Sequence, residues 1–305
     1  MKVLLLVKTH KASSTTAAAV TKQIAAHVGK RIFKDRSSCK QESEHWFSMN
    51  EHGHWKRGES SFMWTIVREP SSRAVSHFHF FALGFNGRET YEDSELIQHL
   101  NSVKNYQFNF IRVLNQWTLA YGGKEETNAT SLSHNLDSLV HQYLKPQVLY
   151  AYNFIAVTER WDESMVLMKL LFDLEFEDVI TLSSKSSGGY NRHWGNPGTC
   201  FHIPKANVSS TVKEYIQTEF RIGNLDILLH AAANRSLDLT IDAYGREEFR
   251  NELEEYRAIQ KLVEETCAPQ AVYPCTSNGE FTAETPKGCY HEDQGMISFL
   301  YCILL

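Results

Sequence analysis

The sequence predicts an α/β fold with a mostly parallel central sheet and flanking helices, and two observations carry this prediction. Short runs of Val, Leu, Ile and Phe without polar alternation are typical of strands that are buried on both faces, as in parallel sheets. These runs alternate along the chain with longer segments of helical apolar spacing, as βαβ units require. A chain of 305 residues can bury one large core, and we expect the α/β domain over residues 1–266 and a Cys-rich tail over 267–305.

The expected elements follow from the apolar pattern in chain order. Strands are expected at residues 3–7, 31–33, 62–67 and 154–158. Helices are expected from about residue 17 to Gly29, from Pro70 past Ser76, and over 91–121, 136–144, 162–174, 209–233 and 245–266, with Asp162, Glu163 and Ser164 capping the fifth of them. Polar or Gly- and Ser-rich segments are expected as loops at 34–60, 122–134 and 183–193.

Lysines and hydroxyl side chains directly follow the first expected strand, in the segment Lys8-Thr-His-Lys-Ala-Ser-Ser-Thr-Thr16. A strand that turns into a helix leaves free N–H groups and the positive end of the helix dipole at the turn. The segment therefore predicts a phosphate or sulfate site, although Ser13 or Ser14 as a simple N-cap, with solvated lysines, is the alternative. The Walker pattern is absent because no glycine precedes Lys11, which argues against an ordinary P-loop kinase.

A second candidate anion site follows the expected strand 62–67. Arg68 stands at the carboxyl end of that strand, which is the edge where open parallel sheets bind ligands. Pro70 suits the first turn of a helix, and Ser76 lies about two turns further along it. Three histidines precede the strand in residues 45–54, but no Cys or acidic residue lies at ligand spacing, so we expect no metal site.

The net charge of −5 gives no reason to expect a general nucleic-acid surface. Cys39 and Cys200 stand alone, whereas four cysteines crowd the last forty residues, at 267, 275, 289 and 302. Their spacing does not fit zinc pairs, so we expect disulfides within a loop-rich tail and an oxidising compartment. Three sequons, which begin at Asn128, Asn207 and Asn234, indicate the same compartment.

The two anion motifs together resemble the carbohydrate sulfotransferases of the Golgi. The first segment is similar to the K-T-H-K-T-[AG]-S-S-T loop of the galactose 3-O-sulfotransferases, and Arg68 with Ser76 matches their R-x7-S pattern. His52-Gly-His54 is similar to the H-G-H of the uronyl 2-O-sulfotransferases. The resemblance covers residues 2–20 and 50–82 firmly and 157–159 loosely. It departs at Ala12, where the family usually has Thr.

The resemblance implies a P-loop-like sulfotransferase fold that transfers a sulfuryl group from PAPS (3′-phosphoadenylyl sulfate) to a carbohydrate hydroxyl without a metal. Residues implied in donor binding are Lys8, Lys11, Ser13, Ser14, Thr15, Thr16, Arg68, Ser76, Lys185 and Arg192. His54 is implied as the base and Lys11 as the cation that stabilises the departing phosphate oxygen. His52, Trp55 and His77 are expected near the acceptor.

The expected partner is a glycan, glycolipid or polysaccharide, with no nucleic acid. No segment of the chain is long enough to span a membrane, and its opening lacks the features of a signal peptide. With the cysteines and sequons, this predicts a protein of the Golgi lumen whose N-terminal anchor is missing from this sequence, the cytoplasm being the alternative.

Two other functions fit part of this pattern. A kinase-like phosphotransferase would require ATP and magnesium, and the missing Walker glycine counts against it. A catalytically inactive PAPS- or glycan-binding module is the other, because the tail departs from the family-like pattern C-Y-x-x-D-x-G-C. After Cys289 and the glycine at 295, the chain has Met296 where the final cysteine is expected.

Overall fold

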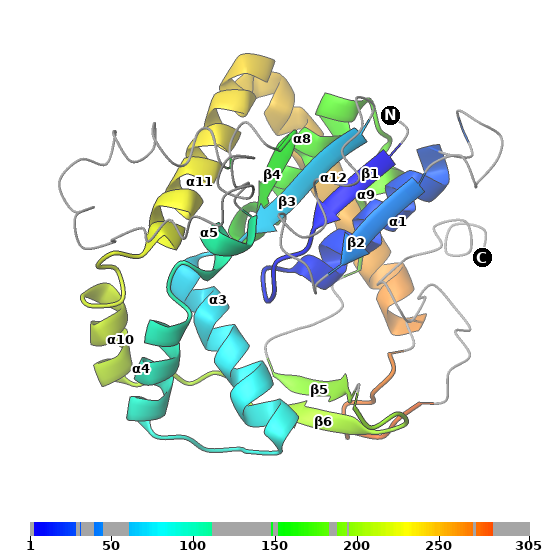
Figure 1. Ribbon diagram of the computed structural model, residues 1–305. Coiled ribbons are helices and arrows are strands. Elements are labelled where there is room, and N and C mark those ends of the chain that lie inside the picture. The colour runs from blue at the N-terminus through cyan, green and yellow to red at the C-terminus, as the bar shows by residue number, and fades with distance from the viewer. Residues whose placement is uncertain are drawn as a thin grey trace, which may run out of the picture.

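The computed structural model describes residues 3–28, 31, 40–44, 61–111, 148, 152–182, 188–193, 195–270 and 273–282. Over these residues the chain forms one parallel sheet flanked by helices and, beside it, a separate two-stranded sheet (Figure 1). The expected α/β architecture with a parallel sheet is therefore confirmed.

The main sheet contains four parallel strands in the order β2-β1-β3-β4. Their bounds are Val3–Val7 (β1), Lys40–Glu44 (β2), Ser61–Val67 (β3) and Phe154–Val157 (β4). The register pairs Val7 with Glu44 on one side and with Thr65 on the other. Since the chain passes from β1 to β2 on one side and β3 lies on the other, the strand order reverses between β1 and β3. Open α/β sheets bind ligands at this switch point.

The apolar runs of the sequence form the interior strands, as expected. Leu4 and Leu6 of β1 are buried, as are Trp64 and Ile66 of β3. The expected strand at 31–33 is wrong for Arg31, which belongs to no strand, and residues 32 and 33 lie outside the described residues.

The neighbour of β1 is instead β2, which falls in the segment expected as a loop. Its sequence, Lys-Gln-Glu-Ser-Glu, has no apolar run, because a strand at the edge of a sheet pairs through its backbone and need not be apolar on either face.

Helices cover the faces and ends of the sheet. Those packed around it are α1 (Ser14–Val28), α5 (Tyr106–Ile111), α8 (Trp161–Phe172), α9 (Phe176–Val179), α11 (Leu225–Tyr244) and α12 (Arg246–Cys267). Short 3₁₀ turns precede α8 at Thr158–Arg160 (η8) and follow α12 at Ala268–Gln270 (η9). None of the helices that the structure describes combines the length and the apolar character needed to cross a membrane.

Two helix predictions need correction. The residues expected to cap α8 lie inside its first turn, and the Ser164 hydroxyl accepts a hydrogen bond of 3.1 Å from the Val157 N–H instead. The single helix expected over 209–233 is two helices, α10 (Ser210–Gln217) and α11. The chain breaks between them because Gly223 has a φ of 66° and the Asn224 side chain caps α11 by accepting from the Asp226 N–H.

A second, smaller core lies at the carboxyl edge of the sheet, where Figure 1 shows α3, α4 and α10 together. Its elements are α3 (Pro70–His77), the π-helical turn η4 (Phe78–Leu83), the 3₁₀ turn η5 (Gly84–Asn86), α4 (Asp93–Ser102) and α10. Phe78, Leu96 and Phe220 are buried in this core. The helix expected over 91–121 is interrupted at Asn105, whose φ is 61°. Residues 112–121 and the helix expected over 136–144 lie outside the described residues.

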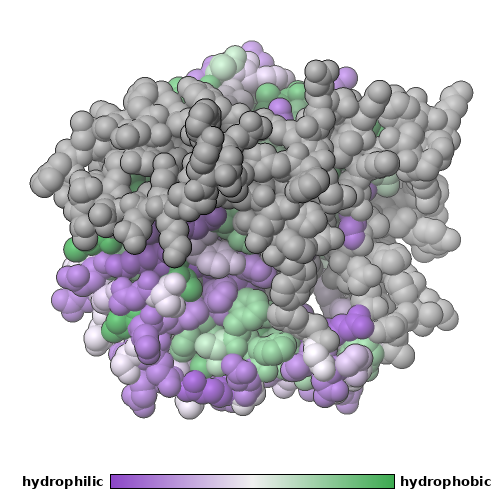
Figure 2. Space-filling view, viewed as in Figure 1, coloured by the Kyte–Doolittle hydropathy of each residue, from purple (hydrophilic) through white to green (hydrophobic). Residues whose placement is uncertain are grey.

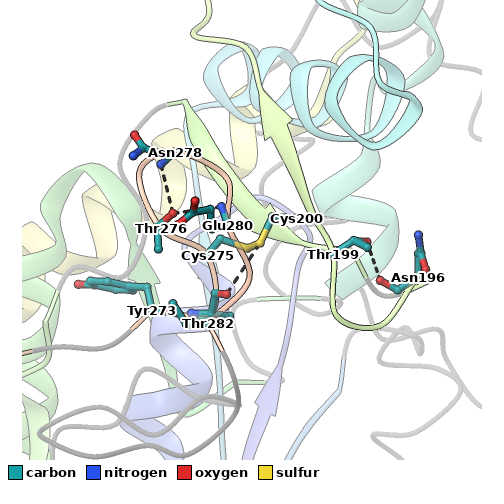
Figure 3. The surroundings of a disulfide bond; sticks show 10 residues. Asn196, Thr199, Cys200, Tyr273, Cys275, Thr276, Asn278, Glu280 and Thr282 are labelled. Atoms are coloured by element: carbon teal, nitrogen blue, oxygen red, sulfur yellow. Dashed lines mark hydrogen bonds between the residues drawn. A yellow bond between two sulfur atoms is a disulfide. The ribbon is translucent and has the colours of Figure 1, made fainter.

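The separate sheet is an antiparallel hairpin of β5 (Gly189–Arg192) and β6 (Cys200–Ile203), so part of the loop expected at 183–193 is a strand. A disulfide joins Cys200 to Cys275 in the tail, with the Cα atoms 6.0 Å apart (Figure 3). A disulfide is therefore present, but it joins the tail to Cys200 of the hairpin and does not lie within the tail as expected. Cys267 is a buried free thiol at the end of α12. Sequence spacing cannot reveal a partner that the fold supplies from the hairpin.

Candidate functional site

The segment between β1 and α1, residues 8–13, is called the first loop below. Two of its non-glycine residues have left-handed backbone angles, Lys11 with φ 63° and Ser13 with φ 51°. Each such conformation costs on the order of 1 kcal/mol, and strain of this kind gathers at functional sites. Alternating backbone handedness turns successive N–H groups toward one point and forms an anion-binding nest. The loop geometry thus suits an anion.

The amino end of α1 adds backbone donors to the first loop. The Ser13 carbonyl accepts a hydrogen bond from the Ala17 N–H at 3.0 Å. The N–H groups that come before Ala17 in the first turn have no acceptor within the helix. The first turn of α1 has no acidic residue. By contrast, Glu69 occupies the amino end of α3 and accepts from the Ser71 and Ser72 N–H groups at 3.0 and 2.7 Å. Of these two helix ends, only that of α1 can attract an anion.

The side chains of the first loop divide between the core and the surface. Ala12 is fully buried in the main core, so its methyl group packs in the interior and its side chain offers no contact to a ligand. Thr9 is also fully buried, and its Oγ1 has no hydrogen-bond partner among the described residues. Lys8, Lys11 and Ser13 of the loop are half-buried. In the first turn of α1, Ser14 is buried, and Thr15 and Thr16 are half-buried.

Arg68 joins the second motif to the first. Its Nη1 donates to the Lys11 carbonyl at 3.1 Å, across the switch point between β1 and β3. Gln107 of α5 holds the Arg68 backbone on both sides, because its Oε1 accepts from the Arg68 N–H and its Nε2 donates to the Arg68 carbonyl, each at 2.8 Å. The arginine at the end of β3 is therefore fixed against the first loop.

A carboxylate network surrounds Arg68 from the side of β4. Glu159 Oε1 lies 4.0 Å from Arg68 Nε and accepts from the Glu69 N–H at 3.0 Å, and Glu159 Oε2 lies 3.1 Å from His230 Nε2. Burial lowers the pKa of Arg68, and Glu159 and Glu69 oppose this effect. Arginine nevertheless keeps its charge at any physiological pH. Burial raises the pKa of Glu159, but the hydrogen bonds from His230 and from the Glu69 N–H outweigh it, so this pKa is lowered.

Asp226 holds the backbone at Gln107 through hydrogen bonds. Its two oxygens accept from the Gln107 and Phe108 N–H groups at 3.1 and 2.8 Å. The residue is fully buried, and burial raises the pKa of its carboxyl to about 6. This buried carboxylate fixes the start of α5 and, through Gln107, the backbone of Arg68.

Aromatic rings lie on the other side of the first loop. The Lys11 ammonium lies 4.1 Å from the centre of the Phe80 ring, a cation–π contact that restrains the side chain. His10 packs edge to face on Phe81 and Tyr106, with ring centres 5.9 and 6.3 Å away. Figure 2 shows apolar residues gathered on the surface over the C-terminal end of α3 and η4, with hydrophilic residues around them.

Two histidines lie beside a buried arginine in the same region. His77 Nδ1 lies 3.2 Å from His99 Nε2. Burial, reinforced by the charge of Arg73, lowers the pKa of His77 to about 3 and that of His99 to about 4, so both rings are neutral at neutral pH. Arg73 itself is fully buried, with its guanidinium 4.4 Å from the centre of the Tyr106 ring and Nη2 donating to Val103 at 3.4 Å. Its Nε and Nη1 have no hydrogen-bond partner in the part of the chain that the structure describes.

The structure brings together the residues predicted on the two strand ends. These are Lys8, Lys11, Ser13, Ser14, Thr15, Thr16 and Arg68. Ser76 is half-buried on α3, next to His77. Arg192 lies on β5, with its guanidinium 5.8 Å from the Phe281 ring in the tail. The remaining predicted residues lie outside the described residues, and they are His52, His54, Trp55 and Lys185.

Sequence reasoning missed Glu159, Gln107 and Asp226 as parts of this site. Glu159 follows β4 directly, as Arg68 follows β3, so the same rule about strand ends points to it. Gln107 and Asp226 belong to helices without a recognisable motif, and only the packing of α5 against the start of α11 brings them to Arg68.

A group that could hold a metal ion lies at the other end of α1. His27, Glu177 and Asp178 each offer a ligand atom, and these atoms lie within 4.8 Å of one another. However, the Arg31 guanidinium already binds Asp178 through both terminal nitrogens, at 3.1 and 2.5 Å. An arginine in that position takes the place of a metal cation.

The first loop and Arg68 thus form a cationic site at the switch point, built from a helix amino end, half-buried lysines and hydroxyls, and a fixed guanidinium. The chemistry of such a site suits an anion with several oxygen atoms, such as a phosphate or sulfate ester. No protein-family model and no curated protein sequence matches the chain.

Proposed function

We propose that the chain is a PAPS-dependent sulfotransferase that acts on a hydroxyl group of a carbohydrate. The observation that carries the proposal is the hydrogen bond from Arg68 Nη1 to the Lys11 carbonyl, because it unites two anion-binding motifs that were identified separately in the sequence. The resemblance of both motifs to the Golgi carbohydrate sulfotransferases supplies the identity of the donor.

The residues present fit a donor that is anionic at both ends. PAPS carries a phosphosulfate on its 5′ oxygen and a phosphate on its 3′ oxygen, so it requires two neighbouring anion sites. The first loop with the amino end of α1 is the proposed site for the phosphosulfate, and Arg68 with Ser76 is the proposed site for the 3′-phosphate. Arginine has five N–H donors, so the bond to Lys11 leaves others for a phosphate.

The proposed chemistry is a direct displacement at sulfur. The acceptor oxygen forms a bond to sulfur while the bond from sulfur to the bridging phosphate oxygen breaks, and the acceptor proton passes to a base. Lys11, restrained over Phe80, would stabilise the negative charge that develops on the departing oxygen. His54 is the proposed base by resemblance, since a neutral imidazole removes a proton near neutral pH. The protein would otherwise act by positioning, as in phosphoryl transfer.

We place the protein in the Golgi lumen as part of the same proposal. The disulfide between Cys200 and Cys275 supports an oxidising compartment, because such bonds are rare in the cytosol. The acceptor would then be a glycan, glycolipid or polysaccharide that passes through this compartment.

Calorimetric titration with PAP (3′,5′-ADP), and separately with ATP and magnesium, tests the donor site. We expect PAP to bind and Arg68→Ala to weaken the affinity for PAP at least tenfold. Tenfold corresponds to about 1.4 kcal/mol, and a hydrogen bond to a charged group contributes about 1.5–3 kcal/mol. Arg88→Ala is the matched control, because Arg88 forms an exposed ion pair with Glu95. Equal PAP affinity in the two variants, or binding of ATP alone, would contradict the proposal.

Transfer of labelled sulfate from PAPS to a panel of glycans tests the reaction itself. We expect His54→Ala to lose turnover and to keep its affinity for PAP, and Lys11→Ala to lose both. Absence of transfer to every glycan, with intact PAP binding, would instead indicate an inactive binding module.

A further inference from the structure

Two of the three sequons of the chain lie in described residues, and the fold treats their asparagines differently. Asn207 is exposed in the irregular segment between β6 and α10, whereas Asn234 is half-buried in the middle of α11. We infer that Asn207 carries an N-linked oligosaccharide and that Asn234 does not. This inference does not depend on the proposed sulfuryl transfer.

Hydrogen bonds hold the backbone around Asn207, and the residue itself is exposed. The Asn207 carbonyl accepts from the Tyr91 hydroxyl at 3.0 Å. The hydroxyl of Ser209, the third residue of the sequon, donates to Asp93 at 2.7 Å and accepts from the Val212 N–H at 3.2 Å as the N-cap of α10. A glycan on the exposed Asn207 amide leaves all three of these bonds in place. The folded chain can therefore carry a glycan at this residue without rearrangement.

The surroundings of Asn234 are different. Its Nδ2 donates to the His230 carbonyl at 2.9 Å, one helical turn earlier. The same nitrogen would have to carry the sugar, and the backbone carbonyl of Asn234 accepts from Arg160 Nη1 at 3.2 Å. A bulky substituent here would disturb the packing of α11 against η8. Glycosylation at Asn234 therefore conflicts with the fold.

The disulfide agrees with the compartment where this modification takes place. Cys200 lies on β6, shortly before Asn207, and bonds such as the one it forms with Cys275 are typical of oxidising compartments. N-linked glycans are added to exposed Asn-x-Ser/Thr segments in such a compartment. The disulfide and the exposure of Asn207 are independent observations, and both agree with the modification.

The modification is a glycosyl transfer from a lipid-linked oligosaccharide diphosphate. A bond forms between Asn207 Nδ2 and the anomeric carbon of the oligosaccharide, and the bond from that carbon to the diphosphate oxygen breaks. The amide loses one proton, and the lipid diphosphate leaves. No redox partner is needed, and the transferase supplies the catalytic groups.

The test uses the full chain behind a cleavable signal peptide, secreted from cultured animal cells. Treatment with peptide N-glycanase converts a glycosylated asparagine to aspartate, which mass spectrometry of the sequon peptides detects. We expect conversion at Asn207 and none at Asn234. An unmodified Asn207 in the secreted chain, or modification of Asn234 to the same extent, would overturn the inference.

Matched variants separate glycosylation from folding. On a gel, Asn207→Gln should migrate faster than the unsubstituted chain, by the mass of one glycan. Asn234→Gln should migrate to the same position as the unsubstituted chain. Ser209→Thr keeps both the sequon and an oxygen that caps α10, so it should keep the glycan. Loss of the glycan in Ser209→Thr, or an unchanged mobility of Asn207→Gln, would contradict the assignment.

Discussion

Removal of the disulfide is the perturbation whose magnitude the structure defines best. Cys200 and Cys275 are 75 residues apart in the sequence, and in the chain-entropy model a bond closing such a loop stabilises the fold by about 4.5 kcal/mol. The bond holds the tail segment against the β5–β6 hairpin. Within the tail segment, the Thr276 N–H donates to the Glu280 carbonyl at 2.9 Å and the Thr282 hydroxyl donates to the Tyr273 carbonyl at 2.6 Å.

The double variant Cys200→Ser/Cys275→Ser removes the bond and leaves no unpaired thiol at either of these positions. For a chain of 305 residues, a loss of about 4.5 kcal/mol lowers the melting temperature by about 7 °C. Differential scanning calorimetry measures this shift, and denaturant unfolding followed by circular dichroism measures the free energy. Cys267→Ala is the control, since it removes a buried thiol and keeps the disulfide. A double variant that melts at the same temperature as the control would refute the reasoning that this bond constrains the unfolded chain.

Three further outcomes follow from buried groups. Gly84→Ala should cost about 1–3 kcal/mol of unfolding free energy in denaturant titration, because the added Cβ would lie 2.5 Å from the His202 carbonyl oxygen, and unchanged stability would contradict that close approach. The pKa of Asp226 is raised to about 6, so the folded state keeps this proton at a higher pH than the unfolded state does. The free energy of unfolding should therefore fall as pH rises from about 4 to 6, and this fall should be absent in Asp226→Asn. The pKa values of His77 and His99 are lowered to about 3 and about 4, so the free energy of unfolding should fall as pH drops below about 6.5. The ring protons of both residues should show no NMR titration above pH 5. A titration midpoint near 6.5 for either ring would argue against their burial.

Elements with a strong apolar signal could be predicted from the sequence. The runs at 3–7, 62–67 and 154–157 are strands because side chains buried on both faces must all be apolar. β2 could not be predicted, since its polar sequence pairs only through the backbone at the edge of the sheet. The break between α10 and α11 had a local signal, Gly223 followed by a capping asparagine, which the helical apolar spacing across it outweighed.

The cationic residues of the candidate site could be predicted from the sequence, but the residues that hold them in place could not. The rule that parallel strands present their carboxyl ends at one edge was sufficient to expect Arg68 near Lys11. Gln107 holds the Arg68 backbone from 39 residues further along the chain, and Asp226 holds Gln107 from 119 residues beyond it. No local pattern in one sequence encodes contacts over such separations.

The fixed guanidinium of Arg68 has a consequence for the energetics of ligand capture. A free arginine side chain carries about 2 kcal/mol of rotamer entropy, which a ligand normally removes when it binds. Here the contact with the Lys11 carbonyl removes much of that freedom when the chain folds. On the proposed function, an anion at this site would meet a preorganised donor and lose less affinity to ordering than it would at a flexible arginine.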